Sequence, residues 1–408
     1  MEYKTKTIDM MRELKTYFLM AIVLAQFACS KDETTVVKPQ LTGKLDAQLG
    51  IEAVPSSLGR KYTKNFNRYT KVMTPNGGAI HIVAQSNITN EQIVRCRSIL
   101  KHYLNNYPGS KYGSDKSAVA NKMAANKAVL TLLNGSDDGK NPVEVNGQPL
   151  YENEIQVEGH AWYVEQDYKK HRDAAFEEIL HLVHDYGIGI DGSNGTSGAA
   201  PEFQAEIRAA QKNALSAKLW GLGSENASWI KELTKENSLS QEYLASLIDS
   251  YYGLWGAWKG NATHGMWGIY QAKNRSEIAK EDLIGQGLMN NKFFHPYLTY
   301  NARIDSSFTG IFSLKFDASV AYSHHSRYLK DITLLGKRNT NVRVNELDND
   351  ITGNKGINTI IFSGNKADYT ITNTEGVLTV KDNTANRDGE NSLRKVEKLQ
   401  FTDQVVTL

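Results

Sequence analysis

The chain is poor in cysteine and proline and carries no large excess of charge of either sign. Its 408 residues include two cysteines and eight prolines, and the formal net charge is +2. The balanced charge and the lack of a long Lys/Arg run argue against a nucleic-acid partner. With 40% hydrophobic residues the chain can bury an ordinary core, and its length allows two or three domains.

The N-terminus also lacks a hydrophobic run long enough to span a membrane. Arg12 and Lys15 precede an apolar run over residues 17–28, and twelve helical residues extend only about 18 Å. The hydrocarbon core of a bilayer is about 30 Å thick. A short apolar run behind basic residues is typical of an exported precursor, so we interpret residues 1–28 as a signal peptide.

The end of this run resembles the cleavage box of bacterial lipoproteins. Cys29 follows the run directly, and residues 30–33 resemble the acidic surface-export tag behind the lipidated cysteine of Bacteroidetes lipoproteins. The resemblance implies that Cys29 carries lipid and anchors the protein in the outer membrane, facing outward. An ordinary secreted protein with a coincidental cysteine is the alternative. If Cys29 is lipidated, Cys96 has no partner for an internal disulfide, and stability must come from the core.

Composition divides the remaining chain into three parts. Residues 29–58 are rich in polar and turn-forming residues, which predicts a flexible tether. Residues 59–335 contain the periodic apolar segments of the main body. From residue 336 onward Asp, Asn, Gly, Thr and Val dominate, which predicts a small all-β module over residues 336–408. We therefore expect an α+β protein with a mainly helical body, a small sheet and a β module.

One segment of the body concentrates acids and histidines on a predicted helix. Within residues 176–187, Glu177, His181 and His184 fall within about 60° of one another at 100° per residue, and apolar residues occupy another side. Three potential metal ligands therefore share one stripe. The alternative is an amphipathic helix whose Glu and His side chains pair with their neighbours one turn away.

This segment resembles the His-Glu-x-x-His motif of the zincin metallopeptidases, specifically the branch whose third ligand is a Glu on a following helix. Glu177 stands at the first His, Glu178 at the general base and His181 at the second His. The change at the first position exchanges a nitrogen donor for a hard oxygen, which lowers selectivity for zinc. The resemblance implies a zincin-like fold for the body.

A second segment resembles the anthrax lethal factor type of domain within this branch. Residues 201–207 are similar to its Glu-Phe-Phe-Ala-Glu segment, in which the second Glu completes the metal site. The resemblance implies Glu206 as third ligand, with Glu202 as fallback and His184 as an alternate ligand.

A zinc ion in such a site hydrolyses peptides with the Glu at the base position accepting a proton. We therefore expect a metal-dependent hydrolase, in particular a zinc peptidase, that acts on a peptide or protein. The alternative is a catalytically inactive zincin-like surface module that binds peptide, matrix or glycan. Five tryptophans between residues 220 and 267 fit either a sugar-binding platform or a Trp-rich helical core.

Apolar periodicity predicts further elements of the body. Residues 79–84 are expected to form a strand, and residues 89–107 and 118–133 to form helices. Residues 155–164 have strand character. By analogy with zincins, in which the strand before the metal-site helix follows the substrate cleft, this segment is expected to pair with an extended peptide.

The C-terminal module contains a segment that resembles a calcium-binding nonapeptide repeat. Residues 353–361 match one copy of Gly-Gly-x-Gly-x-Asp-x-apolar-x, with Asn358 at the position of the Asp ligand, and the residues that follow resemble the β segment that trails such repeats. A single copy without its carboxylate predicts no strong calcium binding.

Overall fold

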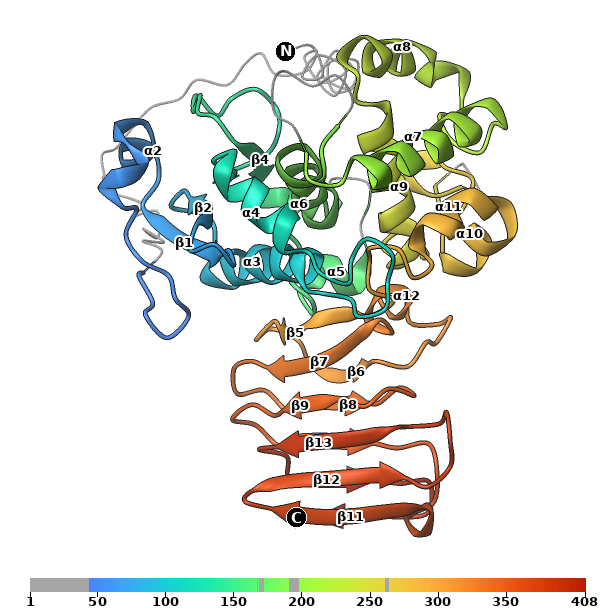
Figure 1. The fold of residues 1–408 in the computed structure, drawn as a ribbon. Helices are drawn as coiled ribbons and strands as arrows, with labels where there is room; N and C mark the ends of the chain where they lie inside the picture. Colours follow the sequence, from blue (N-terminus) through green and yellow to red (C-terminus); the bar gives the residue numbers. More distant parts are fainter. Residues whose placement is uncertain (1–43, 167, 169–171, 191–197, 261–263) are drawn as a thin grey trace, which may run out of the picture.

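The computed structural model describes residues 44–166, 168, 172–190, 198–260 and 264–408 (Figure 1). Within them the protein is an α+β structure, as predicted, with a helical body above a stack of strands. The predicted signal peptide, Cys29 and the first part of the tether lie outside the described residues. Among the helices that are described, none has the length and apolar character that crossing a membrane requires.

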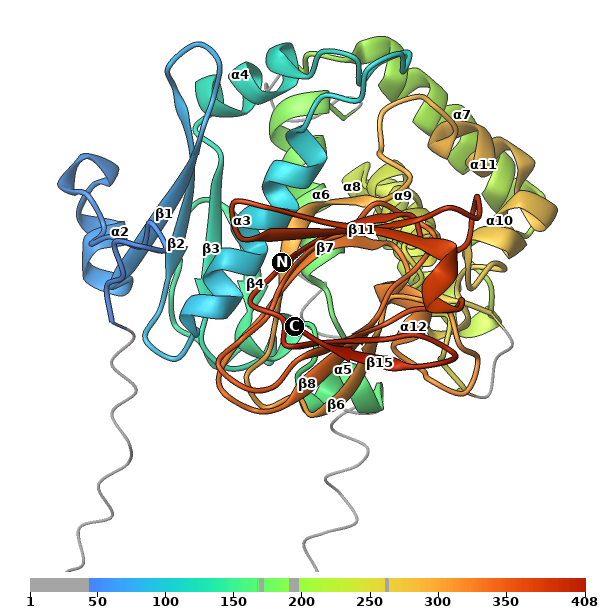
Figure 2. The ribbon, with the colours of Figure 1, turned by 90° about the horizontal axis from the view of Figure 1, so that it is seen from below.

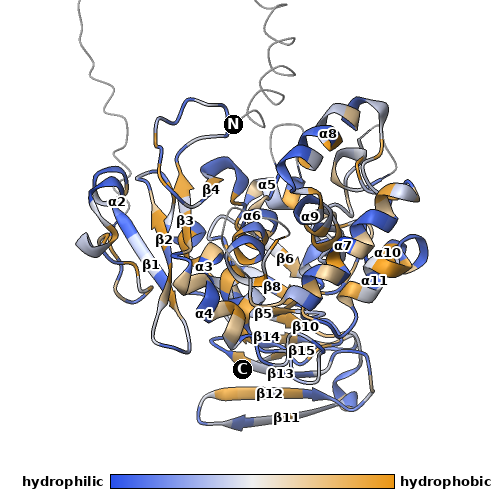
Figure 3. Cartoon of the chain, turned by 45° about the horizontal axis from the view of Figure 1, so that its top comes forward, coloured by the Kyte–Doolittle hydropathy of each residue, from blue (hydrophilic) through white to orange (hydrophobic). Residues whose placement is uncertain are grey.

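The body begins with a four-stranded sheet in the order β1-β2-β3-β4, so that β4 forms one edge. Strands β1 and β2 are antiparallel, whereas β2, β3 and β4 run parallel. Strands β2 and β3 consist mostly of hydrophobic residues (Figure 3), and β3 is buried along its whole length, as is typical of an inner strand of a parallel sheet. The bounds are β1 (Arg68–Met73), β2 (Ala79–Ala84), β3 (Val129–Leu133) and β4 (Gln148–Tyr151).

The predicted strand over residues 79–84 is confirmed as β2, and the first predicted helix is confirmed as α3 (Asn90–Leu104). Thr89 caps α3 by accepting a hydrogen bond from the backbone of Gln92. The second predicted helix, over residues 118–133, is only half right. Helix α4 (Ser117–Ala125) ends two residues before Lys127, which has a left-handed backbone. The apolar residues that follow form β3, which pairs with β2.

The C-terminal part of the expected tether belongs to the folded body. Ile51 is 1% exposed, and the backbones of Glu52 and Tyr69 exchange two hydrogen bonds of 2.8 Å. Val54 and Leu58 pack on the face of the sheet opposite α3. Apolar residues within a mostly polar segment therefore attach residues 44–58 to β1.

Helix α6 (Ala175–Val183) lies at the centre of the body and contacts α3, α9 and β4. A π-helical turn, His184–Ile188, follows it. Trp220 and Trp255 are buried, in agreement with a Trp-rich core, whereas Trp267 is half exposed. The remaining helices are α2 (Arg60–Asn65), α5 (Ala161–Glu165), α7 (Pro201–Ser216), α8 (Ala227–Glu236), α9 (Leu239–Tyr251), α10 (Arg275–Glu281), α11 (Leu283–Met289) and α12 (Ser323–Ser326).

The β module is a coil of strands that alternate between two stacked sheets, as the view from below shows (Figure 2). The six-stranded sheet has the order β11-β12-β13-β9-β7-β5 and the five-stranded sheet the order β15-β14-β10-β8-β6. Successive turns pair in parallel, and antiparallel strands close the far end. The first strands are β5 (Leu298–Ile304), β6 (Gly310–Ser313), β7 (Leu329–Leu334), β8 (Thr340–Arg343) and β9 (Asp350–Thr352). The last are β10 (Thr359–Ile361), β11 (Tyr369–Thr374), β12 (Val377–Asp382), β13 (Glu390–Arg394), β14 (Lys398–Gln400) and β15 (Val405–Thr407).

The predicted boundary between residues 335 and 336 therefore falls inside these sheets. Strands β6 and β7 precede the boundary and pair with β8 and β9, respectively, beyond it, and β5 pairs with β7. Along the chain, the strands of the module begin before the amino-acid composition changes. The first turn of the coil still contains aromatic residues and the short helix α12.

Asparagine amides connect successive turns of the module. Asn358 is fully buried, and its Nδ2 donates to the carbonyl of Thr340 at 2.8 Å and to Oδ1 of Asn354 at 3.1 Å. Its Oδ1 accepts a hydrogen bond of 2.8 Å from the backbone of Asn354. The side chain at the position of the calcium ligand thus takes part in hydrogen bonds between and within turns.

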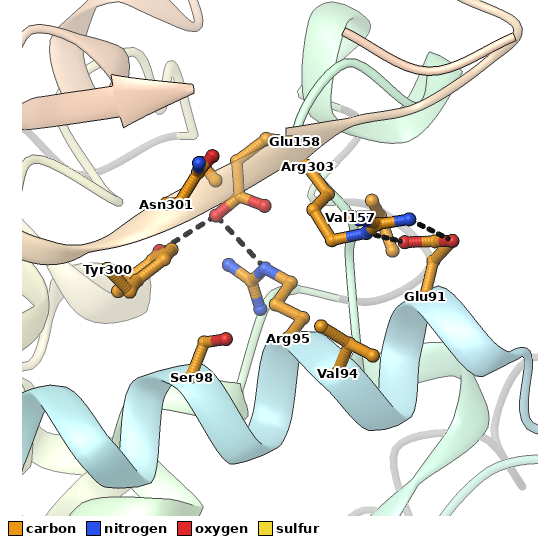
Figure 4. Close-up of a pocket in the computed structure, with 10 residues that line it drawn as sticks. Glu91, Val94, Arg95, Ser98, Val157, Glu158, Tyr300, Asn301 and Arg303 are labelled. Atoms are coloured by element: carbon orange, nitrogen blue, oxygen red, sulfur yellow. Dashed lines mark hydrogen bonds and ion pairs between the residues drawn. The ribbon is translucent and has the colours of Figure 1, made fainter. Parts of the chain in front are cut away.

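A buried ionic network joins the body to the module around a cavity of about 10 Å³ (Figure 4). Arg95 of α3 donates to Glu158 at 3.1 Å through Nε, and Glu158 also accepts a 2.9 Å hydrogen bond from Tyr300 of β5. The guanidinium of Arg95 donates hydrogen bonds to both oxygens of Asp173, two residues before the start of α6. The network therefore fixes the N-terminal end of α6 relative to α3 and β5.

Candidate metal centre

Helix α6 places Glu177 and His181 on one buried face. The two residues are four apart and lie one above the other on successive turns. Glu177 is 3% exposed and His181 is 8% exposed. Burying two ionisable groups side by side costs free energy unless each has a polar or charged partner. The groups that face Glu177 and His181 therefore determine whether this face of α6 can bind a metal.

The third member of the group comes from α9. Glu242 lies in the first turn of that helix. One of its carboxylate oxygens and one ligand atom each of Glu177 and His181 all lie within 4.8 Å of one another. Glu242 is 7% exposed. Two carboxylates and one imidazole from two helices therefore converge on one point, which is a set of donors that divalent metal ions accept.

Three atoms of this group are buried without a hydrogen bond within the described residues, and one of them, Oε2 of Glu177, forms an ion pair with Arg172. His181 Nε2 lies 3.8 Å from Glu242 Oε1, and both this nitrogen and Oε2 of Glu242 are buried without a hydrogen bond. On its other side, Nδ1 of His181 lies 3.6 Å from Oε2 of Glu178. A carboxylate beside one ring nitrogen favours the proton there and leaves the other nitrogen free to bind a metal.

The buried acids affect one another's protonation. Burial raises the pKa of Glu242 to about 7. Burial by itself lowers the pKa of His181, but the carboxylates of Glu242 and Glu178 outweigh it and raise that pKa above its ordinary value. The site therefore favours an added positive charge, whether the charge is a proton on His181 or a cation between the ligands.

Arg172, just before α6, lies against the carboxylate of Glu177. Its Nη1 is 3.7 Å from Oδ2 of Asp249 on α9, and its guanidinium lies 4.9 Å from the ring centroid of Trp267. Burial raises the pKa of Asp249 well above its ordinary value, which favours the neutral acid. Arg172 is thus a positive charge next to one carboxylate of the metal-ligand group.

Glu178 lies beside the group rather than within it. Its side chain is 22% exposed, which makes it more accessible than Glu177, His181 or Glu242. The amide of Gln148 on β4 donates a 2.6 Å hydrogen bond to its carboxylate. Glu178 therefore lies between the buried ligands and β4.

The prediction that Glu206 completes the site is wrong. Its carboxylate accepts hydrogen bonds from Lys111, Lys292 and Tyr112 near the surface. Burial acts to raise the pKa of Glu206, but these hydrogen bonds lower it to about 2. The fallback, Glu202, is exposed on the same helix, α7. The match over residues 201–207 correctly predicted a helix, α7, but this helix does not supply the third ligand.

His184 is also not part of the group. The α-helical part of α6 ends at Val183, and His184 begins the π turn. Its Nε2 lies 2.5 Å from Oε1 of Gln204 on α7. Gln204 in turn donates to Ser240 of α9. His184 therefore takes part in a buried polar contact that connects three helices.

Sequence reasoning missed Glu242, although a weak signal was present. Glu242 and Asp249 are seven residues apart in a helix without other charged residues, so both lie on one face two turns apart. Both are buried and face α6 through His181 and Arg172. Two acids at helical spacing within a segment rich in apolar residues were the signal that could have identified α9.

The expected substrate strand is also placed differently. Residues 155–164 contain no strand: Gly159 has a φ of 84°, and the side chain of His160 caps the short helix α5. The edge strand beside Glu178 is β4, which ends before this segment begins.

Comparison with known proteins adds no assignment. No family model matches the chain, and neither does any curated protein. The function must therefore be inferred from the site.

Proposed function

We propose that the protein is a metal-dependent hydrolase, a zinc peptidase with a zincin-like body. The convergence of Glu177, His181 and Glu242, with partnerless buried atoms on the last two, is the observation that carries this proposal. Buried polar atoms without partners are rare, and their cost is removed when a cation binds between them. Three protein ligands also leave a metal position open, as catalytic zinc sites require.

The residues divide the work as follows. A zinc ion held by Glu177, His181 and Glu242 would supply Lewis acidity, which activates water and polarises a peptide carbonyl. Glu178 is the proton carrier in this proposal: it accepts the proton of the attacking water and passes it to the leaving amine. Its partial exposure and its position beside β4 support this role. A substrate is then an extended segment of peptide or protein lying near that edge.

Metal analysis of two matched variants tests the proposal. Glu242→Gln and Glu206→Gln make the same chemical change on neighbouring helices, but only Glu242 belongs to the metal-ligand group. We expect near-stoichiometric zinc in the wild-type protein and in Glu206→Gln, and a loss of zinc from Glu242→Gln and His181→Ala. Absence of zinc from the wild-type protein, or its retention in Glu242→Gln, would rule the site out.

The second candidate function is a catalytically inactive surface module that binds peptide, matrix or glycan. The contact between Arg172 and Glu177 favours it, because an internal guanidinium can balance the buried acids without a metal. The metal analysis separates the two candidates, since only the first requires bound zinc.

We further propose that the protein is an outer-membrane lipoprotein anchored through Cys29 and exposed at the cell surface. The order of basic residues, a short apolar run and Cys29 supports this location. Cys29→Ser expressed in a Bacteroidetes host should lose lipid labelling and leave the membrane fraction. Unchanged membrane association of this variant would contradict the proposal.

A further inference from the structure

Arg172 lies at the one position where the metal-ligand group departs from the zincin pattern. The departure is the carboxylate of Glu177, and Arg172 contacts that carboxylate directly. Its side chain is 12% exposed, so this ion pair is shielded from water. A shielded charge next to a ligand changes the electrostatics of the whole site.

The formal charges of the group show what Arg172 contributes. With His181 neutral, Glu177 and Glu242 give the group a charge of −2, whereas an imidazole at position 177 would leave −1. The positive charge of Arg172 brings the total for the four side chains back to −1. The pair of Arg172 and Glu177 is neutral, as an imidazole is.

Arg172 is held in place by contacts other than the one with Glu177. Oδ2 of Asp249 lies 3.7 Å from its Nη1, and Trp255 donates to the same oxygen at 3.1 Å. The ring of Trp267 faces the guanidinium. The next residue in the chain, Asp173, is clamped by Arg95. The guanidinium is therefore anchored where a carboxylate at position 177 meets it.

We propose that Arg172 is a positioning residue that neutralises Glu177, so that the ion pair, rather than Glu177 alone, takes the part of the first zincin histidine. The inference rests on the proposed metal site. Arg172 contacts Oε2 of Glu177, and a carboxylate has a second oxygen that can bind a metal. A carboxylate ligand held by a second group is oriented and made less negative, and such outer partners typically change metal affinity 10- to 100-fold.

A double-mutant cycle of zinc affinity tests this inference. The proteins are the wild type, Glu177→His, Arg172→Gln and the double variant, each titrated with zinc against a chromophoric chelator and loaded with cobalt for its visible absorption spectrum. Glu177→His leaves the charge of Arg172 unpaired beside the cation, so we expect zinc affinity to fall about tenfold or more. Adding Arg172→Gln removes that charge, and affinity should return to within about threefold of the wild type.

The outcomes are distinct. Recovery in the double variant, with a cobalt spectrum typical of tetrahedral coordination, supports the inference. Equal affinity of Glu177→His and the wild type, or no recovery in the double variant, overturns it while the proposed metal site stands. A wild-type protein that binds no zinc overturns both. If Glu177→His does not fold, as judged from its thermal unfolding in chelator, Arg172→Gln alone tests the inference, because a change in zinc affinity of less than about threefold would overturn it.

Discussion

The amide of Gln148 on β4 donates a 2.6 Å hydrogen bond to the carboxylate of Glu178 on α6. The bond connects the edge of the sheet to the helix that carries two of the proposed ligands. It orients Glu178 without burying it, since the side chain remains 22% exposed. An acid fixed in this way can exchange a proton with a substrate that lies along β4.

Glu178→Gln should abolish hydrolysis and leave the metal content intact. The variant keeps an oxygen that can accept the bond from Gln148 but loses the carboxylate that takes up a proton. We expect a fall in kcat of about 10²- to 10⁴-fold, the range attributed to general acid–base catalysis. Cleavage of a peptide library and zinc analysis on the same preparation measure both properties. Joint loss of zinc and fold would instead give Glu178 a structural role.

Arg95→Met should destabilise the protein severely. Arg95 is the partner of the buried Glu158 and Asp173, and its loss leaves two uncompensated carboxylates. Removal of one partner from a buried ion pair costs about 3–5 kcal/mol. Arg303, which pairs with Glu91 on the rim of the same cavity, is the matched control.

The pair of Arg303 and Glu91 is partly exposed, so Arg303→Met should cost about 1 kcal/mol or less. Urea unfolding of both variants gives the comparison. Similar costs for Arg95→Met and Arg303→Met would show that the network in Figure 4 does not hold the body to the module.

Because Lys116 is buried, we expect the stability of the protein to rise with pH above neutrality. Burial lowers the pKa of Lys116 to about 7, although its Nζ donates to the carbonyl of Tyr103 at 2.9 Å and faces the ring of Phe293. In the unfolded chain the pKa is about 10.4, so between pH 7 and 10.4 the unfolded state binds more protons than the folded state. This group therefore makes stability rise with pH across that window, by up to about 1.4 kcal/mol per pH unit.

Lys116→Met removes this titration. The free energy of unfolding of the variant, measured in urea at pH 7, 8 and 9, should gain less with rising pH than that of the wild type. The lost hydrogen bond to Tyr103 is the same at every pH and does not affect the slope. Parallel slopes for the two proteins would mean that Lys116 stays charged in the folded state.

Asn358→Ala should destabilise the β module. The substitution removes the bonds to Thr340 and Asn354 and leaves buried polar groups without partners, at about 1–3 kcal/mol for each unsatisfied group. Asn358→Asp restores the acid of the nonapeptide repeat but loses the donor to Thr340, so it should also be less stable than the wild type. Thermal unfolding with chelator and with calcium measures both variants. If calcium raises the stability of the wild-type protein, the proposal that the Asn358 amide replaces the calcium ligand with hydrogen bonds is contradicted.

Sequence patterns predicted some of the local elements of this protein correctly. The periodicity of residues 89–107 and the apolar run of residues 79–84 are local properties, and the structure confirms both as α3 and β2. The same holds for the stripe of α6, because the positions of Glu177 and His181 relative to each other follow from the geometry of one helix.

The failures at the candidate site concern contacts between elements. Which acid reaches His181 depends on how α7 and α9 pack against α6, and no spacing along the chain contains that information. Glu206 lies on the side of α7 that meets two lysines, whereas Glu242 lies on the side of α9 that meets α6. The boundary of the β module was misplaced for the same reason, because strand pairing rather than composition decides where a sheet begins.

The sequence by itself determined the α+β class, the helix that carries Glu177, Glu178 and His181, and the change of character toward the C-terminus, since each follows from residue type and period over a few turns. Only the tertiary structure decided that Glu242 joins the group and that Arg172 lies against Glu177. The packing of helices brings metal ligands and counter-charges together. The distance between these residues along the chain does not show that they are in contact.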